Sequence, residues 1–330
     1  MPEAFLQLSP EEQADILQTC AGKLGRRPEH LEKDLWICWV LQGLFTIPGR
    51  LPMAFKGGTS LSKVYGAIRR FSEDVDVTVD YKSLDQSIDP FDAKVSRTAR
   101  EKYTGLLREK LADYTNNVIR PYFEDLLVHL PDKPAHPIKV SGDGEKLFVP
   151  YASRFGNGES VLLEFGGRNV TTPNEEHLLR PYVAAIVPDL QFPEATVLVL
   201  SPSRTFWEKA TLVHVACNRS DPKLDADRQS RHWHDLAVLA DHDIGKTSTA
   251  DRQLLEDVVK HKNVFFRASY TNYEACLSGD LRLIPKTPLL DTLKLDYEKM
   301  IADGMFEGEP PTFEAIISRL DKLATEINAH

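Results

Sequence analysis

Two aspartates one residue apart, Asp74 and Asp76, have the spacing best suited to catalysis in this chain of 330 residues. They alternate with valines at 75, 77 and 79, and this period of two predicts a strand with both aspartates on one face. At about 3.3 Å per residue they lie roughly 7 Å apart along the backbone, so their carboxylates can converge on one hard cation or a cation pair. Mg²⁺ prefers one or two carboxylates plus substrate phosphates, and two such ions can hold the attacking and leaving oxygens of a phosphoryl transfer. The alternative is the polar outer face of an antiparallel sheet.

A glycine turn precedes this strand. The apolar run Pro52–Phe55 leads to Gly57-Gly58-Thr59-Ser60, where the glycines can take positive φ and let a phosphate approach the backbone. Apolar residues then recur at i, i+3, i+4 and i+7, which predicts a helix over Leu61–Ile68. A glycine turn that feeds a helix supplies backbone N–H groups for a triphosphate. With Arg70 and Ser72 directly before the acidic strand, the pattern favours a nucleotide site.

The combination Gly-Gly-Thr-x-Leu-Ser-Lys followed by Arg-Phe-Ser-x-Asp-x-Asp resembles motif I of the AbiEii/AbiGii toxin family. These proteins are nucleotidyltransferases of the DNA polymerase β superfamily, usually encoded beside an antitoxin. The resemblance implies transfer of a nucleoside monophosphate from an NTP to an acceptor hydroxyl, with Mg²⁺ or Mn²⁺ as cofactor. It implies that Asp74 and Asp76 hold the metal and that Arg70 and Ser72 lie beside it. The phosphates would be cradled by Gly57, Gly58, Thr59 and Ser60.

A third acid is predicted at Glu164, within the strand pattern Ser160–Phe165. Val161, Leu163 and Phe165 share one face of that strand, so Glu164 points to the other. An acid inside an otherwise apolar strand costs desolvation unless a partner compensates it. An ordinary edge-strand glutamate is one explanation. The resemblance to the superfamily, which places its third acid on such a strand, implies instead that Glu164 is a third metal ligand.

Two helices near residues 205–214 and 228–239 carry Phe-x-x-Lys and Arg-His-x-x-Asp-Leu, which resemble motif III of the family. The resemblance assigns functional roles to Lys209 and Asp235. Lys209 would offset charge on the leaving pyrophosphate, and Asp235 would orient either Lys209 or Arg231. Without the resemblance, a surface lysine and a helix-pairing aspartate would be the simpler interpretation. We do not predict zinc at His232 and His234, because they are two residues apart and no further zinc motif accompanies them.

Other charged segments admit two interpretations. The triplet Glu32-Lys33-Asp34 recurs in the family upstream of the glycine turn, but its simplest explanation is a polar helix face. Basic residues are frequent between 97 and 110, in a long or kinked helix predicted over 90–130, where they form either a solvated face or an RNA-facing wall. Arg267 and Tyr270 could likewise stack against RNA, although core packing is the more ordinary role of a tyrosine.

Composition bounds the class of protein. Forty basic and forty-nine acidic residues give a net charge of −9, which argues against a broad non-specific nucleic-acid coat but leaves a local basic groove possible. The four cysteines are far apart and form no C-x-x-C, so we expect reduced, buried thiols and a cytoplasmic protein. No apolar run approaches the length of a membrane span.

The expected fold class is α+β. We expect residues 1–44 to form N-terminal helices packed on the core, and residues 45–200 to form a polymerase-β-like nucleotidyltransferase core with a mixed sheet flanked by helices. Residues 201–330 would form a helical C-terminal lobe that completes the active site.

The expected function is that of a toxin in a toxin–antitoxin or phage-defence system, with a tRNA 3′ end as the first choice of acceptor. A protein or small-molecule acceptor is the alternative that the acidic net charge favours. A phosphotransferase or nucleotide-binding regulator that uses the same pocket is the third possibility. A non-enzymatic binding module is disfavoured, because every acid of the motif is present.

Overall fold

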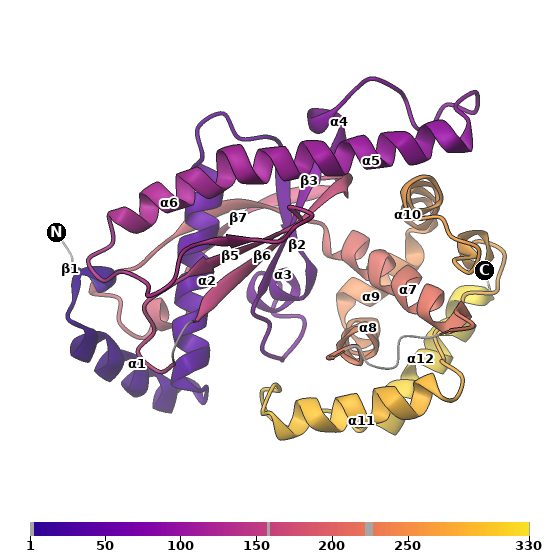
Figure 1. The fold of residues 1–330 in the computed structure, drawn as a ribbon. Helices are drawn as coiled ribbons and strands as arrows, with labels where there is room; N and C mark the ends of the chain where they lie inside the picture. The colour runs from indigo at the N-terminus through magenta and orange to yellow at the C-terminus, as the bar shows by residue number, and fades with distance from the viewer. Residues whose placement is uncertain (1–2, 157–158, 222–226, 330) are drawn as a thin grey trace. The chain divides into compact units, whose positions relative to one another are not determined.

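The computed structural model describes residues 3–156, 159–221 and 227–329. The chain forms two compact units (Figure 1). The first contains Met1–Val64, Ser72–Asp89 and Glu101–Leu200, and the second contains Tyr65–Phe71, Pro90–Arg100 and Ser201–His330. The short segment that joins the glycine turn to the acidic strand therefore belongs to the second unit, while both features that it joins belong to the first.

A seven-stranded mixed sheet forms the centre of the first unit (Figure 1). Its pairs β3–β6 and β2–β9 are parallel and its other pairs are antiparallel. A separate parallel pair joins β1 (Glu3–Ala4) to β8 (Leu190–Gln191). In spatial order the seven strands are β4 (Lys139–Val140), β5 (Lys146–Pro150), β6 (Ser160–Asn169), β3 (Asp74–Asp80), β2 (Met53–Lys56), β9 (Ala195–Leu200) and β7 (Asn174–Leu179).

The helices of this unit confirm the predicted α+β class. They are η1 (Phe5–Gln7), α1 (Pro10–Leu24), α2 (Pro28–Thr46), α3 (Gly57–Lys63), α4 (Tyr81–Leu84), α5 (Arg97–Tyr114), α6 (Arg120–Val128) and η3 (Tyr182–Ala185). α5 begins with residues of the second unit. A π-helical turn, η2 (Thr115–Ile119), joins α5 to α6 without a break, which confirms the predicted long helix but starts it at residue 97.

Helix α2 is buried almost all round, and here one sequence interpretation is wrong. The triplet Glu32-Lys33-Asp34 is not a solvated face, because all three residues are less than 10% exposed. Glu32 accepts hydrogen bonds from Ser153 Oγ and the backbone N–H of Arg154, at 2.5 and 2.6 Å. Lys33 Nζ donates to the carbonyl of Ser160 at 2.6 Å. These buried charges are tolerated because each has found a partner, as burial of polar groups requires.

The helix predicted over Leu61–Ile68 is also wrong in extent. α3 ends at Lys63, and Gly66 has φ +58°, a left-handed conformation that no α-helix continues through. Beyond it, Phe71 N–H donates to Met305 O at 2.7 Å, and Glu307 N–H donates to Arg69 O at 3.0 Å. Extended pairing within the second unit therefore takes the place of the last helical turn.

The second unit is helical beyond residue 201. Trp207 lies in its core and donates from Nε1 to the carbonyl of Ser248 at 3.1 Å. The last helix buries an apolar stripe of Phe313, Ile316, Leu320, Leu323 and Ile327, and it packs against α8. None of the described helices is long and apolar enough to cross a membrane. The helices are α7 (Pro202–Asn218), α8 (Arg231–Asp241), α9 (Asp243–Ala250), α10 (Arg252–Phe265), η4 (Tyr273–Cys276), α11 (Leu289–Ala302) and α12 (Phe313–Asn328).

Candidate active site

The backbone of Gly57 lies directly against the side chain of Asp76. Strand β2 ends at Lys56, which pairs with Asp76 of the antiparallel strand β3, and the chain then turns into α3 through Gly57 with φ +82°. A Cβ placed on Gly57 would lie 2.0 Å from Oδ2 of Asp76 and 2.7 Å from its Cγ. The carboxylate therefore occupies the space that any other side chain at position 57 would need. The glycine turn and the acidic strand are thus in direct contact at this point.

The hydroxyls of the turn are used inside the protein. Thr59 Oγ1 lies 2.5 Å from the carbonyl oxygen of Asp74 and 2.8 Å from Ser72 Oγ, so it joins α3 to the beginning of β3. Ser60 Oγ donates to the carbonyl of Gly57 at 2.9 Å. Thr59 and Ser60 are 2% and 0% exposed. Their hydroxyls hold the turn in shape, which leaves the backbone as the part of this segment able to meet a phosphate.

The three predicted acids share one face of the sheet. In the parallel pair β3–β6, Asp76 is opposite Glu164 and Asp74 is opposite Leu162. Register partners in neighbouring strands point to the same side, and residues i and i+2 of one strand do so as well. The valines between the aspartates are fully buried on the other side. The alternation in the sequence therefore gave the correct face for Asp74, Asp76 and Glu164.

The carboxylate of Glu164 is engaged by a lysine that the sequence analysis did not single out. Lys146 of β5 is its register partner, and Lys146 Nζ lies 2.5 Å from Glu164 Oε1. The hydrogen bond with Glu164 raises the pKa of Lys146, and the nearby charge of Asp74 adds to the effect. The side chains of this pair are 46% and 30% exposed, so solvent screens it and its contribution to stability is about 0–1 kcal/mol.

The donor set suits a hard divalent cation. Asp74 and Asp76 offer carboxylate oxygens from neighbouring positions of one strand face, as Mg²⁺ and Mn²⁺ sites require. Within residues 3–156, 159–221 and 227–329, no three histidine, cysteine, aspartate or glutamate side chains group closely enough to hold a metal. The two aspartates have the ligand chemistry for such an ion, while Glu164 contacts Lys146, and the roles of all three as metal ligands stay predictions.

A buried ion cluster in the second unit contains Arg70, Lys209 and Asp235. Arg70 donates from Nε and Nη2 to the two carboxylate oxygens of Asp235 at 2.7 and 2.8 Å, and from Nη1 to the carbonyl of Phe71. Lys209 Nζ donates to Asp235 Oδ2 at 2.9 Å. Asp235 is fully buried, while Arg70 and Lys209 are 3% and 8% exposed. Asp235 therefore orients Lys209, one of the two partners considered from the sequence, and also binds Arg70.

The electrostatics of this cluster are set by its cations. Burial alone would raise the pKa of Asp235, but the charges of Arg70 and Lys209 outweigh it and hold that pKa well below its usual range. Burial, together with Lys209 and Arg231, lowers the pKa of His232 well below its usual range, so this imidazole is neutral at pH 7. The cluster carries net positive charge, which favours an anion beside it.

A second buried pair, Lys63 with Asp34, fixes the far end of α3. Lys63 Nζ lies 2.5 Å from Asp34 Oδ1 and donates to the carbonyl of Arg180 at 3.0 Å, and Asp34 Oδ2 accepts from the backbone N–H of Tyr182. Burial would lower the pKa of Lys63, but Asp34 raises it above its usual value. Both side chains are nearly inaccessible, so the pair anchors α3, and with it the glycine turn, to α2. The recurrence of Asp34 upstream of the glycine turn, together with Lys63 within motif I, was the signal that could have indicated this role.

The fold and the acidic strand define the class of the protein. Among solved structures the chain is similar to MenT4, a nucleotidyltransferase toxin from Mycobacterium tuberculosis H37Rv, with a TM-score of 0.51. The two share 16% sequence identity, and the similarity covers 97% of this chain and 89% of that chain. At this identity the likeness shows the fold alone, which is that of a nucleotidyltransferase toxin. A comparison with curated proteins gave no match.

Residues 39–319 match the family described as Nucleotidyl transferase AbiEii toxin, Type IV TA system. Because this match covers most of the chain, the protein belongs to the AbiEii family and is a nucleotidyltransferase toxin of the type IV toxin–antitoxin class. The resemblance inferred from motif I is confirmed.

Proposed function

We propose that the protein transfers a nucleoside monophosphate from an NTP to an acceptor hydroxyl of RNA, with a tRNA 3′ end as the acceptor. The observation that carries the proposal is the fit of Asp76 against Gly57, with Asp74 and Glu164 on the same face of the sheet. This arrangement presents carboxylates beside a glycine turn, which is what a nucleotide with bound metal requires.

Asp74 and Asp76 would hold Mg²⁺ or Mn²⁺, with Glu164 joining them when its contact with Lys146 is exchanged. The bound ion would neutralise phosphate charge and favour deprotonation of the acceptor hydroxyl. The phosphates themselves would be bound by residues of the glycine turn. Gly57 and Gly58 would present backbone N–H groups to the phosphates, while the hydroxyls of the turn keep its shape.

Lys209 would offset the negative charge that develops on the leaving pyrophosphate. Its ammonium is held by Asp235, which is shared with Arg70, so the side chain of Lys209 is already oriented within the second unit. Such preorganisation is the main way in which a protein stabilises a charged transition state. Arg70 acts through Asp235 in this proposal, and Ser72 acts by supporting Thr59.

Labelled nucleotides test the proposal. The protein is incubated with total RNA and each NTP, labelled in turn at the α- or the γ-phosphate. We expect the α label in RNA in the tRNA size range and none of the γ label. The α label in protein or a small molecule would favour the alternative acceptors. The net charge of −9 is the observation that favours these alternatives. Transfer of the γ label alone would identify a phosphotransferase.

We further propose that a cognate antitoxin, encoded nearby, opposes this activity, that the system serves in phage defence, and that the toxin acts in the cytoplasm. Membership of the type IV toxin–antitoxin class supports the first of these. NTPs and tRNA are both cytoplasmic, which supports the last. Deleting the neighbouring gene while the toxin is expressed tests for the antitoxin, because growth should then stop.

A further inference from the structure

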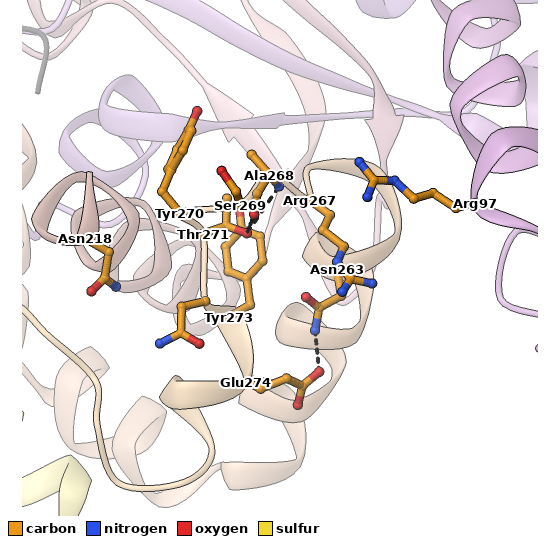
Figure 2. A pocket seen from close by; sticks show the side chains of 11 residues that line it. Arg97, Asn218, Asn263, Arg267, Ala268, Ser269, Tyr270, Thr271, Tyr273 and Glu274 are labelled. Carbon is orange, nitrogen blue, oxygen red and sulfur yellow. Dashed lines mark hydrogen bonds between the residues drawn. The ribbon is translucent and has the colours of Figure 1, made fainter. Parts of the chain in front are cut away.

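A polar cavity in the second unit has no part in the site described above. Its volume is about 540 Å³, within the range of small-ligand pockets. Figure 2 shows it between the end of α10, the loop that follows α10, and Arg97 at the beginning of α5. We call it the Tyr270 pocket and define it by Arg97, Asn218, Asn263, Arg267, Ser269 and Tyr270.

Hydrogen bonds hold the loop that forms the pocket in one conformation. Thr271 is 4% exposed, and its Oγ1 donates to the carbonyl of Ala268 at 3.0 Å. Asn272 has φ +41°, a left-handed conformation that asparagine tolerates better than most residues. His214, fully buried, donates from Nε2 to the carbonyl of Asn272 at 3.1 Å, while its Nδ1 accepts from the backbone N–H of Arg282. Burial lowers the pKa of His214, so this neutral arrangement persists at pH 7.

The pocket carries an aromatic face. Tyr270 is 36% exposed, which is high for a tyrosine, and the guanidinium of Arg219 lies 4.8 Å from the centre of its ring. This is a cation–π contact, and the ring of Tyr270 serves as the aromatic platform of the pocket. In Figure 2 the ring of Tyr270 stands apart from Tyr273, which is buried. From the sequence, core packing was the more ordinary role for Tyr270, and its exposure contradicts that role.

The pocket also carries positive charge. Arg97 and Arg267 line it, and Figure 2 shows the side chain of Arg97 pointing towards the loop that bears Arg267. Among the described residues that line the pocket there is one acid, Glu274, and it accepts a hydrogen bond from Asn263 Nδ2 at 2.5 Å. Two guanidiniums provide planar donors that match a phosphate. These two arginines make the pocket a local basic site in a protein of net charge −9.

We infer that the Tyr270 pocket binds one unpaired nucleotide of the acceptor RNA, with the base stacked on Tyr270 and a phosphate held by Arg97 and Arg267. This inference rests on the proposed function and names a recognition site for its RNA substrate. Unpaired bases in RNA are recognised by stacking on aromatic rings and arginine planes. An acidic peptide would satisfy the arginines, but it would leave the aromatic platform and most of the cavity without a role.

The test measures binding in the absence of any NTP, so that it does not depend on transfer. The full-length protein is titrated against a short fluorescein-labelled single-stranded RNA, and anisotropy is recorded at several salt concentrations. Tyr270→Ala should weaken binding about tenfold, since stacking on an aromatic residue contributes about 5- to 150-fold per base. Tyr270→Phe is the matched control and should bind like the wild type, because it keeps the ring.

Arg97→Gln and Arg267→Gln should each lower the slope of log affinity against log salt by about 0.7, the value for one phosphate contact on a single strand. Lys322→Gln, an exposed change on α12, is the control and should leave that slope unchanged. An RNA with an abasic site at the bound position should lose its sensitivity to Tyr270→Ala.

The outcomes separate this inference from the proposed function. If all three pocket variants bind RNA as the wild type does, the inference is wrong, whether or not α label enters RNA. Failure of the wild type to bind RNA, with a poly-glutamate peptide bound through the same residues, would also overturn it and assign the pocket to a protein. If the variants lose RNA binding but no RNA ever receives the α label, the pocket stands and the proposed function fails.

Discussion

Substitution of Gly57 by alanine isolates the contact between the glycine turn and the acidic strand. The new Cβ would lie 2.0 Å from Asp76 Oδ2, and separations below about 3.0 Å are essentially never seen for a Cβ. The carboxylate of Asp76 must therefore move by at least about 1 Å. A misplacement of that size at a reacting centre can lower the rate about 100-fold. The backbone strain is separate: an alanine at positive φ costs about 1–2 kcal/mol.

Gly25→Ala is the matched control, because Gly25 has φ +64°, belongs to the same unit and has open space where its Cβ would be. We expect both variants to lose about 1–2 kcal/mol in urea denaturation. Only Gly57→Ala should lose about 100-fold in the incorporation of α-labelled NTP, measured with the RNA that the wild type accepts best. If Gly57→Ala keeps the activity of Gly25→Ala, Asp76 does not act where we place it.

Four further outcomes are expected. Asp74→Asn should lower label incorporation by more than about 100-fold, because a metal ligand is lost, with little change in the melting temperature. Asp235→Asn should cost about 3–5 kcal/mol in urea at pH 7, because two buried cations lose their anion. Since its pKa is lowered on folding, this contribution is present above the unfolded pKa of about 3.9 and is lost as the pH falls, so at pH 3 the difference from the wild type should shrink. Lys146→Gln should free Glu164 and strengthen Mn²⁺ binding by up to about fivefold in calorimetry; if Glu164→Gln binds Mn²⁺ as tightly as the wild type, Glu164 is not a ligand. Burial raises the pKa of the Cys38 thiol to about 12, so a thiol reagent should reach it only in denaturant.

The face to which each side chain of β3 and β6 points could be predicted from the sequence. One side of each strand is buried, so apolar and polar residues alternate with a period of two. Asp74 and Asp76 were assigned to the correct face for this reason, and Glu164 by the same alternation in β6. The register between two strands produces no comparable pattern in the sequence. Lys146, which lies opposite Glu164, was therefore missed. The polar strand β7, whose sequence is Asn174-Glu-Glu-His-Leu-Leu179, was missed because its apolar alternation is weak.

Partners of buried charges could not be predicted in the same way. Arg70 and Asp235 are 165 positions apart, and nothing local marks them as a pair. The triplet at 32–34 has the composition of a solvated helix face, and only partners supplied by distant segments make its burial possible. Composition reports how hydrophilic a segment is, whereas burial depends on which other segments come to meet it.

Helix α2 has a consequence for the order in which the protein is made. Its charged turn is completed by Lys63, Ser153, Ser160 and Tyr182, and the last of these is 148 residues after Asp34. At about 5–20 residues per second, roughly 7–30 s of translation separate the emergence of the helix from that of its final partner. Through that interval only α1, made before it, can pack against the helix, so part of its apolar surface stays exposed on the nascent chain. The glycine turn, anchored through Lys63 to this same helix, cannot reach its working shape until most of the first unit has been synthesised.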